Sequence, residues 1–151
     1  MSTITATRDA VVTALNAASF FTSFTPSITA VAIYDIYFNL QQLTSPRVVV
    51  VPSKRLDEII TRASDQKIEV GIDVAVQIKY DAPTTTILDP YMGLAESICD
   101  FFKAKILTGA TLGNGAVCLS VTWPHGPYLD KHMQDFRVFT SIVSLSFTVI
   151  K

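Results

Sequence analysis

The most regular pattern along the chain is a strict alternation over residues 68–80, in which every even-numbered position is apolar. Side chains of a β-strand point alternately to its two faces, so the pattern predicts a long strand with one buried face. At about 3.3 Å per residue, such a strand spans roughly 43 Å. Typical strands have only about 5–6 residues, so we expect this one to extend beyond the core.

Four other stretches also favour extended structure. Residues 138–150 alternate and predict a long terminal strand whose second face carries Ser and Thr instead of charge. Residues 117–123 predict another alternating strand. Residues 47–51 form a β-branched run between two prolines, which is typical of a strand buried on both faces. Residues 31–40 alternate loosely and predict a short strand rich in aromatic residues.

Apolar residues at three- and four-residue spacing predict two helices. The first covers residues 5–24, with Thr7 as its N-cap. The second begins with Asp89 as N-cap and Pro90 at the first helical position, and it ends before Gly109. Its apolar stripe is formed by Tyr91, Leu94, Ala95, Ile98, Phe101, Phe102 and Ile106.

The remaining segments read as connections. Residues 53–66 are polar and predict a solvated connection with one helical turn near residues 56–60. Residues 108–115 predict a Gly- and Thr-rich loop, and residues 128–136 are polar. We therefore expect one α+β domain over residues 1–151, with a mixed, mostly antiparallel sheet whose long strands pack against two helices.

Composition narrows the class of protein. Of 151 residues, 49% are apolar and only 17% charged, which excludes a disordered chain. No stretch approaches the roughly 20 apolar residues of a membrane-spanning helix. The net charge of −1 lacks the basic excess of nucleic-acid-binding proteins. No secretion signal is visible at the N-terminus, and Cys99 and Cys118 are expected to be reduced, buried thiols of a cytoplasmic product.

A search for catalytic chemistry finds no nucleotide-binding, phosphate-loop, hydrolase or metalloprotease motif. Weaker candidates are a metal site of His125 and His132 with Asp130 or Asp135, a Cys99–His nucleophile pair, paired carboxylates Glu69 and Asp73, and an anion loop at 113–115. Each has a simpler structural interpretation as a loop, core or surface group. We predict that the protein is not an enzyme and that it has no cofactor and no metal.

An interaction protein fits the composition better, because interface cores are poor in charge and rich in aromatic residues. The candidate interface aromatics are Tyr34, Tyr37, Phe38, Tyr128 and Phe136.

The order of elements resembles the tail terminator, or tail completion, proteins of long-tailed bacteriophages. The matching segments are Arg47–Pro52, Ile68–Val74 with Lys79 late in the same strand, Leu94–Phe101, and the ending Tyr128–Asp130 with Phe136–Phe147. The resemblance covers nearly the whole chain. Within these segments Asp73, Lys79 and Arg137 join the five aromatics as candidate interface residues.

The resemblance implies a homo-oligomer, a hexameric ring, that caps the tail tube, ends tube polymerisation and offers a surface to the head–tail connector or adaptor protein. It also implies that DNA passes through the lumen without specific binding, that no membrane is involved, and that the subunit assembles in the host cytoplasm into the virion tail or neck. An alternative is a head-completion protein that binds the portal or adaptor. A third, a small enzyme or ligand-binding domain, requires a pocket of convergent polar groups.

Overall fold

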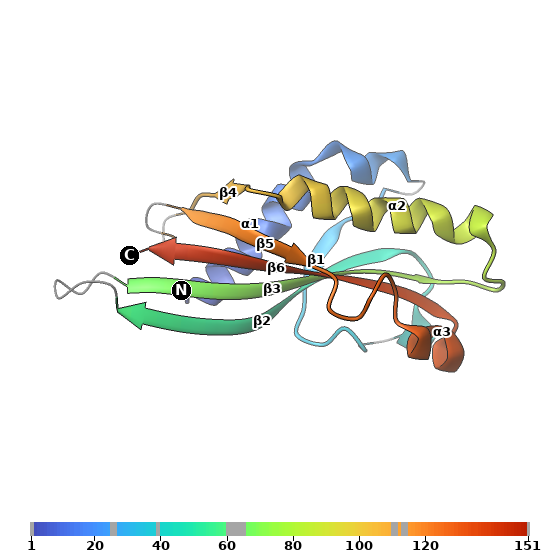
Figure 1. Cartoon of the computed structure of the whole chain (residues 1–151). Coiled ribbons are helices and arrows are strands. Elements are labelled where there is room, and N and C mark those ends of the chain that lie inside the picture. Colours follow the sequence, from blue (N-terminus) through green and yellow to red (C-terminus); the bar gives the residue numbers. More distant parts are fainter. Residues whose placement is uncertain are drawn as a thin grey trace.

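The computed structural model describes residues 2–24, 27–38, 40–59, 66–109, 112 and 115–150. In these residues six strands form one sheet in the order β1-β2-β3-β6-β5-β4 (Figure 1). The strands are β1 (Ala30–Ala32), β2 (Arg47–Ile59), β3 (Gln66–Lys79), β4 (Ile106–Leu107), β5 (Ala116–Thr122) and β6 (Val138–Ile150). The helices are α1 (Thr3–Ala17), α2 (Thr85–Phe102) and α3 (Asp130–Phe136), with 3-10 turns η1 (Ser19–Ser23) and η2 (Leu40–Gln42).

Only β1 and β2 pair in parallel, and every other neighbouring pair of strands is antiparallel. This arrangement confirms the predicted α+β class with a mixed, mostly antiparallel sheet. The two predicted long strands are confirmed as β3 and β6, which pair with each other from Lys67–Ile150 to Lys79–Val138.

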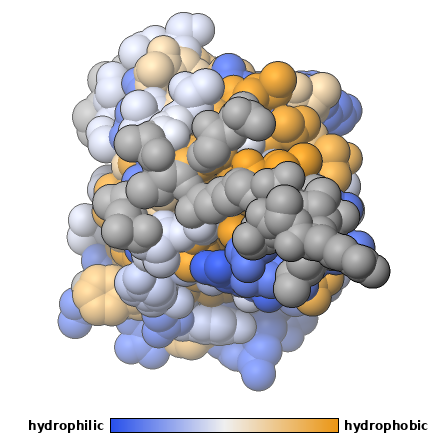
Figure 2. All heavy atoms as spheres, turned by 90° about the vertical axis from the view of Figure 1, so that its left-hand side faces the viewer, coloured by the Kyte–Doolittle hydropathy of each residue, from blue (hydrophilic) through white to orange (hydrophobic). Residues whose placement is uncertain are grey.

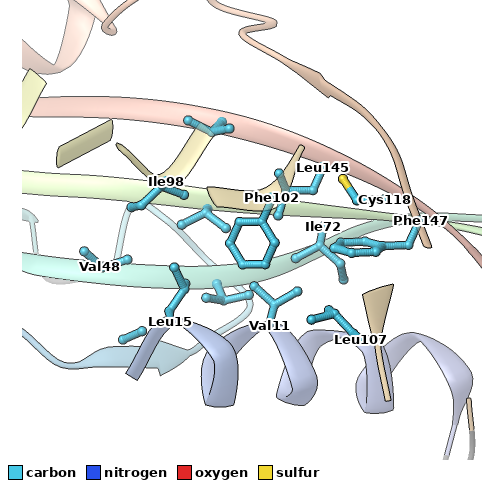
Figure 3. Packing of buried hydrophobic residues seen from close by; sticks show 14 of the residues in the cluster. Val11, Leu15, Val48, Ile72, Ile98, Phe102, Leu107, Cys118, Leu145 and Phe147 are labelled. Atoms are coloured by element: carbon cyan, nitrogen blue, oxygen red, sulfur yellow. The ribbon is translucent and has the colours of Figure 1, made fainter. Parts of the chain in front are cut away.

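Helices α1 and α2 lie on the same side of the sheet, which we call the helix face (Figure 1). The even-numbered residues of β3 from 68 to 76 point to this side and are buried. Val11 and Leu15 of α1 and Ile98 and Phe102 of α2 pack with them (Figure 3). Burial of such large apolar side chains is the main force that holds the helices to the sheet.

The other side of the sheet is divided into two parts. One part is covered by residues 33–38, 40–46 and 128–136, which we call the cap. Ile33, Ile36 and Leu129 of the cap pack on Val49, Ala75 and Ile142. The rest, which we call the open half, carries half-buried polar side chains: Glu69, Asp73, Ser144, Ser146 and Thr148. The expectation of a single buried face on β3 is therefore wrong, because the cap buries Ala75 and Gln77 on the second face.

The first predicted helix is shorter than expected. α1 ends at Ala17, and residues 19–23 form the separate turn η1. Its N-cap is Ser2, whose Oγ accepts a hydrogen bond from the Thr5 amide (3.1 Å). Thr7, the predicted N-cap, is buried within the helix and donates to the Thr3 carbonyl (2.8 Å). A threonine inside a helix can bond back to the preceding turn in this way.

The strand predicted over residues 31–40 is wrong beyond Ala32. The Asp35 side chain accepts a hydrogen bond from the Tyr37 amide (2.8 Å), and the Asp35 carbonyl accepts one from the Phe38 amide (3.1 Å). Such local bonding by Asp stabilises a turn and competes with strand pairing.

The connection predicted over residues 53–66 is also wrong over residues 53–59, which belong to a strand even though residues 53–58 are exposed. Its helical turn is wrong over residues 56–59, and residues 60–65 lie outside the described residues. β2 continues through Pro52 to Ile59 and pairs with β3 along its length. A β-bulge between Pro52 and Lys54 accommodates the proline. Proline is tolerated on an edge strand, where no outer neighbour needs its missing N–H. The burial of Val48, Val49 and Val50 does confirm that this strand begins buried on both faces.

The second predicted helix starts earlier than expected, at Thr85, with Thr84 as N-cap. Pro90 lies inside the helix and is exposed, so water can bond the carbonyl that a proline leaves without a partner. Ile106 falls in β4 instead of the helical stripe. The polar segment 128–136 contains α3. Of the loop predicted over residues 108–115, residues 110, 111, 113 and 114 lie outside the described residues.

Candidate assembly surfaces

Three aromatic side chains project from residues 33–38, which we call the aromatic loop. Tyr34 is 72% exposed, Tyr37 58% and Phe38 57%. The guanidinium of Arg8 lies over the Tyr34 ring, 5.5 Å from its centroid. Large exposed aromatic groups that lie together mark interaction surfaces more often than isolated ones do. The structure thus brings together three of the five aromatics predicted for an interface.

A buried side-chain amide of the sheet holds the backbone of the aromatic loop. Gln77 is fully buried on β3, and its Oε1 accepts a hydrogen bond from Arg47 Nε (2.6 Å). Its Nε2 donates to the Ile36 carbonyl (2.7 Å), and Arg47 also donates to the Phe38 carbonyl. Burial lowers the pKa of Arg47, and the charge of Asp35 works in the opposite direction. These bonds hold the loop backbone, so its aromatic side chains are presented from a fixed support.

A second anchor is His132 on α3, which is 1% exposed. Its Nδ1 lies 2.8 Å from Thr140 Oγ1, and its ring meets Tyr37 edge-on with centroids 4.7 Å apart. Among the described residues, Nε2 has no hydrogen-bond partner. Burial lowers the pKa of His132, although the charge of Asp135 acts in the opposite direction. His132 is therefore a neutral packing group between α3, β6 and the aromatic loop.

A shallow groove lies beside the aromatic loop, between Tyr37, Phe136 and the turn η2. Lys79 Nζ donates to the Gln41 carbonyl at this turn (3.0 Å). Phe136 packs on Leu40, Leu43 and Val138 and is only half-exposed. Of the predicted interface residues, Tyr37, Lys79 and Phe136 thus gather at one place.

The remaining predicted interface residues lie apart from this groove. Tyr128 is exposed with its ring tilted against Phe139, and Arg137 is exposed at the C-cap of α3 in the left-handed conformation. Asp73 lies on the open half, where Ser144 Oγ donates to its carboxylate (2.6 Å). Ser146 similarly donates to Glu69 (3.2 Å), whose other neighbour is Lys54 at 3.9 Å. The two carboxylates are thus occupied by neighbouring hydroxyls, which favours a structural role over acid–base chemistry.

Sequence reasoning did not select several apolar side chains that are exposed on the strands. Leu56 of β2 is 58% exposed, and Leu119 of β5 is 63% exposed. Ile106 of β4 and Ile150 of β6 are exposed as well. Figure 2 views the end of the molecule at which β2 and β6 finish and β3 begins, and hydrophobic surface is visible there. Leu119 is exposed because a bulge between Cys118 and Ser120 breaks the alternation of β5, and the sequence gives no sign of this bulge.

The described residues include both histidines and both cysteines among the catalytic candidates. They contain no group of three His, Cys, Asp or Glu side chains that could hold a metal ion. His125 is exposed in a loop, whereas His132 is buried against Thr140. Both cysteines are free; Cys118 is buried, and burial raises the pKa of its thiol, while Cys99 is only half-buried.

Comparison with known proteins adds no identification. No protein-family model matches the chain, and a search of curated proteins finds no significant relative. Among the described residues, no helix combines the length and apolar character needed to cross a bilayer.

Proposed function

We propose that this protein is a structural subunit of a bacteriophage tail, a tail terminator that forms a hexameric ring on the end of the tail tube. The observation that carries the proposal is the presence of separate exposed apolar surfaces on one small chain. The aromatic loop is one, and two others lie at the two edges of the sheet, with Leu56 on β2 at one edge and Ile106 and Leu119 on β4 and β5 at the other. Scattered single apolar residues are ordinary, but grouped ones need a partner.

Separate surfaces suit a ring. A head-to-tail contact joins two different patches of the same chain, and it closes when the rotation per subunit fits. The subunit must also contact the tube and the connector through further surfaces. Of the surfaces described, the aromatic loop is best suited to a partner protein, because aromatic residues on a fixed support dominate many binding interfaces.

The weak charge of the chain agrees with this role. The open half carries hydroxyls and carboxylates that bond one another, and the whole chain has a net charge of −1. Proteins that bind DNA tightly neutralise its phosphates with clustered Lys and Arg. A ring of this subunit would let DNA pass without specific binding.

The test is to mix purified protein with tail tubes of the same phage and to image the tube ends by negative-stain microscopy. We expect ring-shaped density at one end of each tube. The double variant Tyr34→Ser, Phe38→Ser should lose it, whereas Ile87→Ser, which changes an exposed residue of α2, should retain it. Bare tube ends with the wild-type protein would contradict the proposal. Copurification with the portal or adaptor instead of the tube protein would favour a head-completion role.

A further inference from the structure

Strands β2 and β5 lie next to the short outer strands β1 and β4. Among the described residues, each has a stretch that its outer neighbour does not cover. β1 covers β2 only at Val48–Val50, so β2 from Pro52 to Ile59 pairs only with β3. On the opposite side, β4 covers Ala116 and Val117 of β5. The Cys118 amide donates to the Lys105 carbonyl (2.8 Å), which leaves residues 119–122. Leu119 lies in the bulge, and Ser120, Val121 and Thr122 pair regularly with β6. A free strand edge presents backbone N–H and C=O groups that can pair with another chain.

The directions of these two strands are complementary. β2, β3, β6 and β5 are antiparallel in succession, so β2 and β5 run in opposite directions. A second copy placed by rotation beside the first would bring its β2 antiparallel to β5, with the helices of both copies on the same side. We propose that neighbouring subunits of the ring are joined in this way, by main-chain pairing of β2 in one copy with β5 in the next. This inference rests on the proposed ring.

Only the far part of β2 is suited to such pairing. Pro52 cannot donate a hydrogen bond, and the bulge that follows it disrupts the strand edge. Lys54 adds an exposed charge to the same stretch. Proline, bulges and lysine are the features by which edge strands resist association. The stretch that remains is 55–59, at the end of β2 away from β1.

The alternation of side chains restricts the register. Leu56 pairs with Glu69 of β3. Thr122 pairs with Ser144 of β6, which in turn pairs with Asp73 of β3. These residues all point to the face opposite the helices, so a pairing that keeps the faces continuous must be offset by an even number of residues. Pairing Thr122 of one copy with Leu56 of the next shifts the rows of the two sheets by four residues, the distance from Asp73 to Glu69 along β3. This register leaves Pro52 outside the contact. Closure of a curved sheet requires such a stagger.

The side chains at this register are compatible. Asp57 would lie opposite Val121 on the helix face, because Asp57 is level with the buried Ile68 and Val121 packs on the same core. Val121 shares a groove with Lys103, an exposed cation at the end of α2. Within each subunit Asp57 is paired with Arg55 and Lys103 with Asp100, so neither brings an unpaired charge to the contact. The exposed Leu56 and Leu119 would both be covered by the contact.

Cysteine cross-linking tests the pairing directly. In a background with Cys99→Ala and Cys118→Ala, Leu56→Cys is placed on one protein sample and Thr122→Cys on another, and the samples are mixed and oxidised. Because Cα atoms across an antiparallel pair lie about 4.5–5.5 Å apart, a disulfide can form without backbone movement. We expect dimers only in the mixture. A chain carrying both substitutions should give a ladder up to the hexamer. Ile87→Cys in place of Leu56→Cys is the matched control, because Ile87 is exposed on α2 away from both strands, and it should give no dimers with Thr122→Cys.

The outcomes separate this inference from the proposed function. A Leu56→Cys bond to Ser120→Cys would support the same strand pairing at an offset of two residues. Dimers of Leu56→Cys alone would show two β2 strands paired with each other and would overturn the inference. Rings that are visible by microscopy but give no cross-link would overturn it and leave the proposed function standing. Loss of every oligomer, with or without tail tubes, would overturn both.

Discussion

Replacing Gln77 with Met tests whether a single buried amide fixes the aromatic loop. Methionine is unbranched and of similar length, so the substitution removes both hydrogen bonds with little change in volume. Arg47 would lose the acceptor at 2.6 Å, and the Ile36 carbonyl would lose its donor at 2.7 Å. Gln77 is fully buried, so water cannot readily replace it.

The expected loss follows from the two bonds. A hydrogen bond to a charged group contributes about 1.5–3 kcal/mol and a neutral one about 0.5–1.5 kcal/mol. Arg47 keeps its bond to the Phe38 carbonyl, which retains part of the support. We therefore expect the free energy of unfolding to fall by roughly 2–4 kcal/mol. For a chain of this size, 3 kcal/mol corresponds to a decrease in Tm of roughly 6–12 °C.

Urea denaturation monitored by circular dichroism measures this loss, with Gln134→Met on the exposed side of α3 as control. Limited proteolysis of the native protein provides a local readout, and cleavage within residues 33–46 should be faster in Gln77→Met alone. A fall of less than 1 kcal/mol, about the value of one neutral bond, with unchanged cleavage would refute the assignment of Gln77 as the support of the loop.

Three further predictions concern the sheet and the cap. Val76→Asp should lower stability by at least ~3 kcal/mol in urea denaturation, because Val76 is fully buried on the helix face, and an unchanged midpoint would contradict that placement. His132 has a folded-state pKa below its ordinary 6.5, so the unfolded chain binds more protons and stability should fall as the pH drops below about 6.5. A His132→Gln variant should show a flatter profile between pH 7 and 5, and equal slopes would exclude His132 as the cause. Gly71→Ala places a Cβ 2.5 Å from Ser53 Oγ, so it should cost about 1–3 kcal/mol, and Ser53→Ala should recover part of the loss. If the double variant is no more stable than Gly71→Ala alone, that contact is not the source of the strain.

The elements that the sequence predicts well are those in which one periodicity dominates. β3 and β6 alternate over most of their length, and the valines of β2 form an uninterrupted apolar run. The order of residue types therefore predicts which of their side chains are buried. The apolar stripe of α2 is predicted equally well. Four of its predicted residues are buried: Leu94, Ala95, Ile98 and Phe102.

The errors arose where a local signal competes with tertiary pairing. Pro52 and the charged residues after it read as a connection, yet β3 provides a partner strand that extends β2 to Ile59. Asp89-Pro90 reads as a helix start, yet the helix begins at Thr85 and Pro90 is accommodated on its exposed side. Asp35 acts in the opposite direction by closing a turn where aromatic residues favoured a strand.

Only some residues of the candidate surfaces could be predicted from the sequence. Tyr34, Tyr37 and Phe38 could be selected by residue type, since exposed aromatics are characteristic of interfaces. Leu56 and Leu119 could not, because their exposure depends on where β2 and β5 lose their outer neighbours and on a bulge. Such features depend on strand register, which residue types alone do not specify.

The measurement that tests the central claim most directly is the growth of tail tubes in the presence of this protein. Tube protein of the same phage is polymerised while light scattering is recorded, and tube lengths are then counted by microscopy. We predict that the added protein stops elongation and leaves tubes closed by a ring at one end. Tubes that lengthen at the same rate and to the same length, with no ring at their ends, would contradict the account.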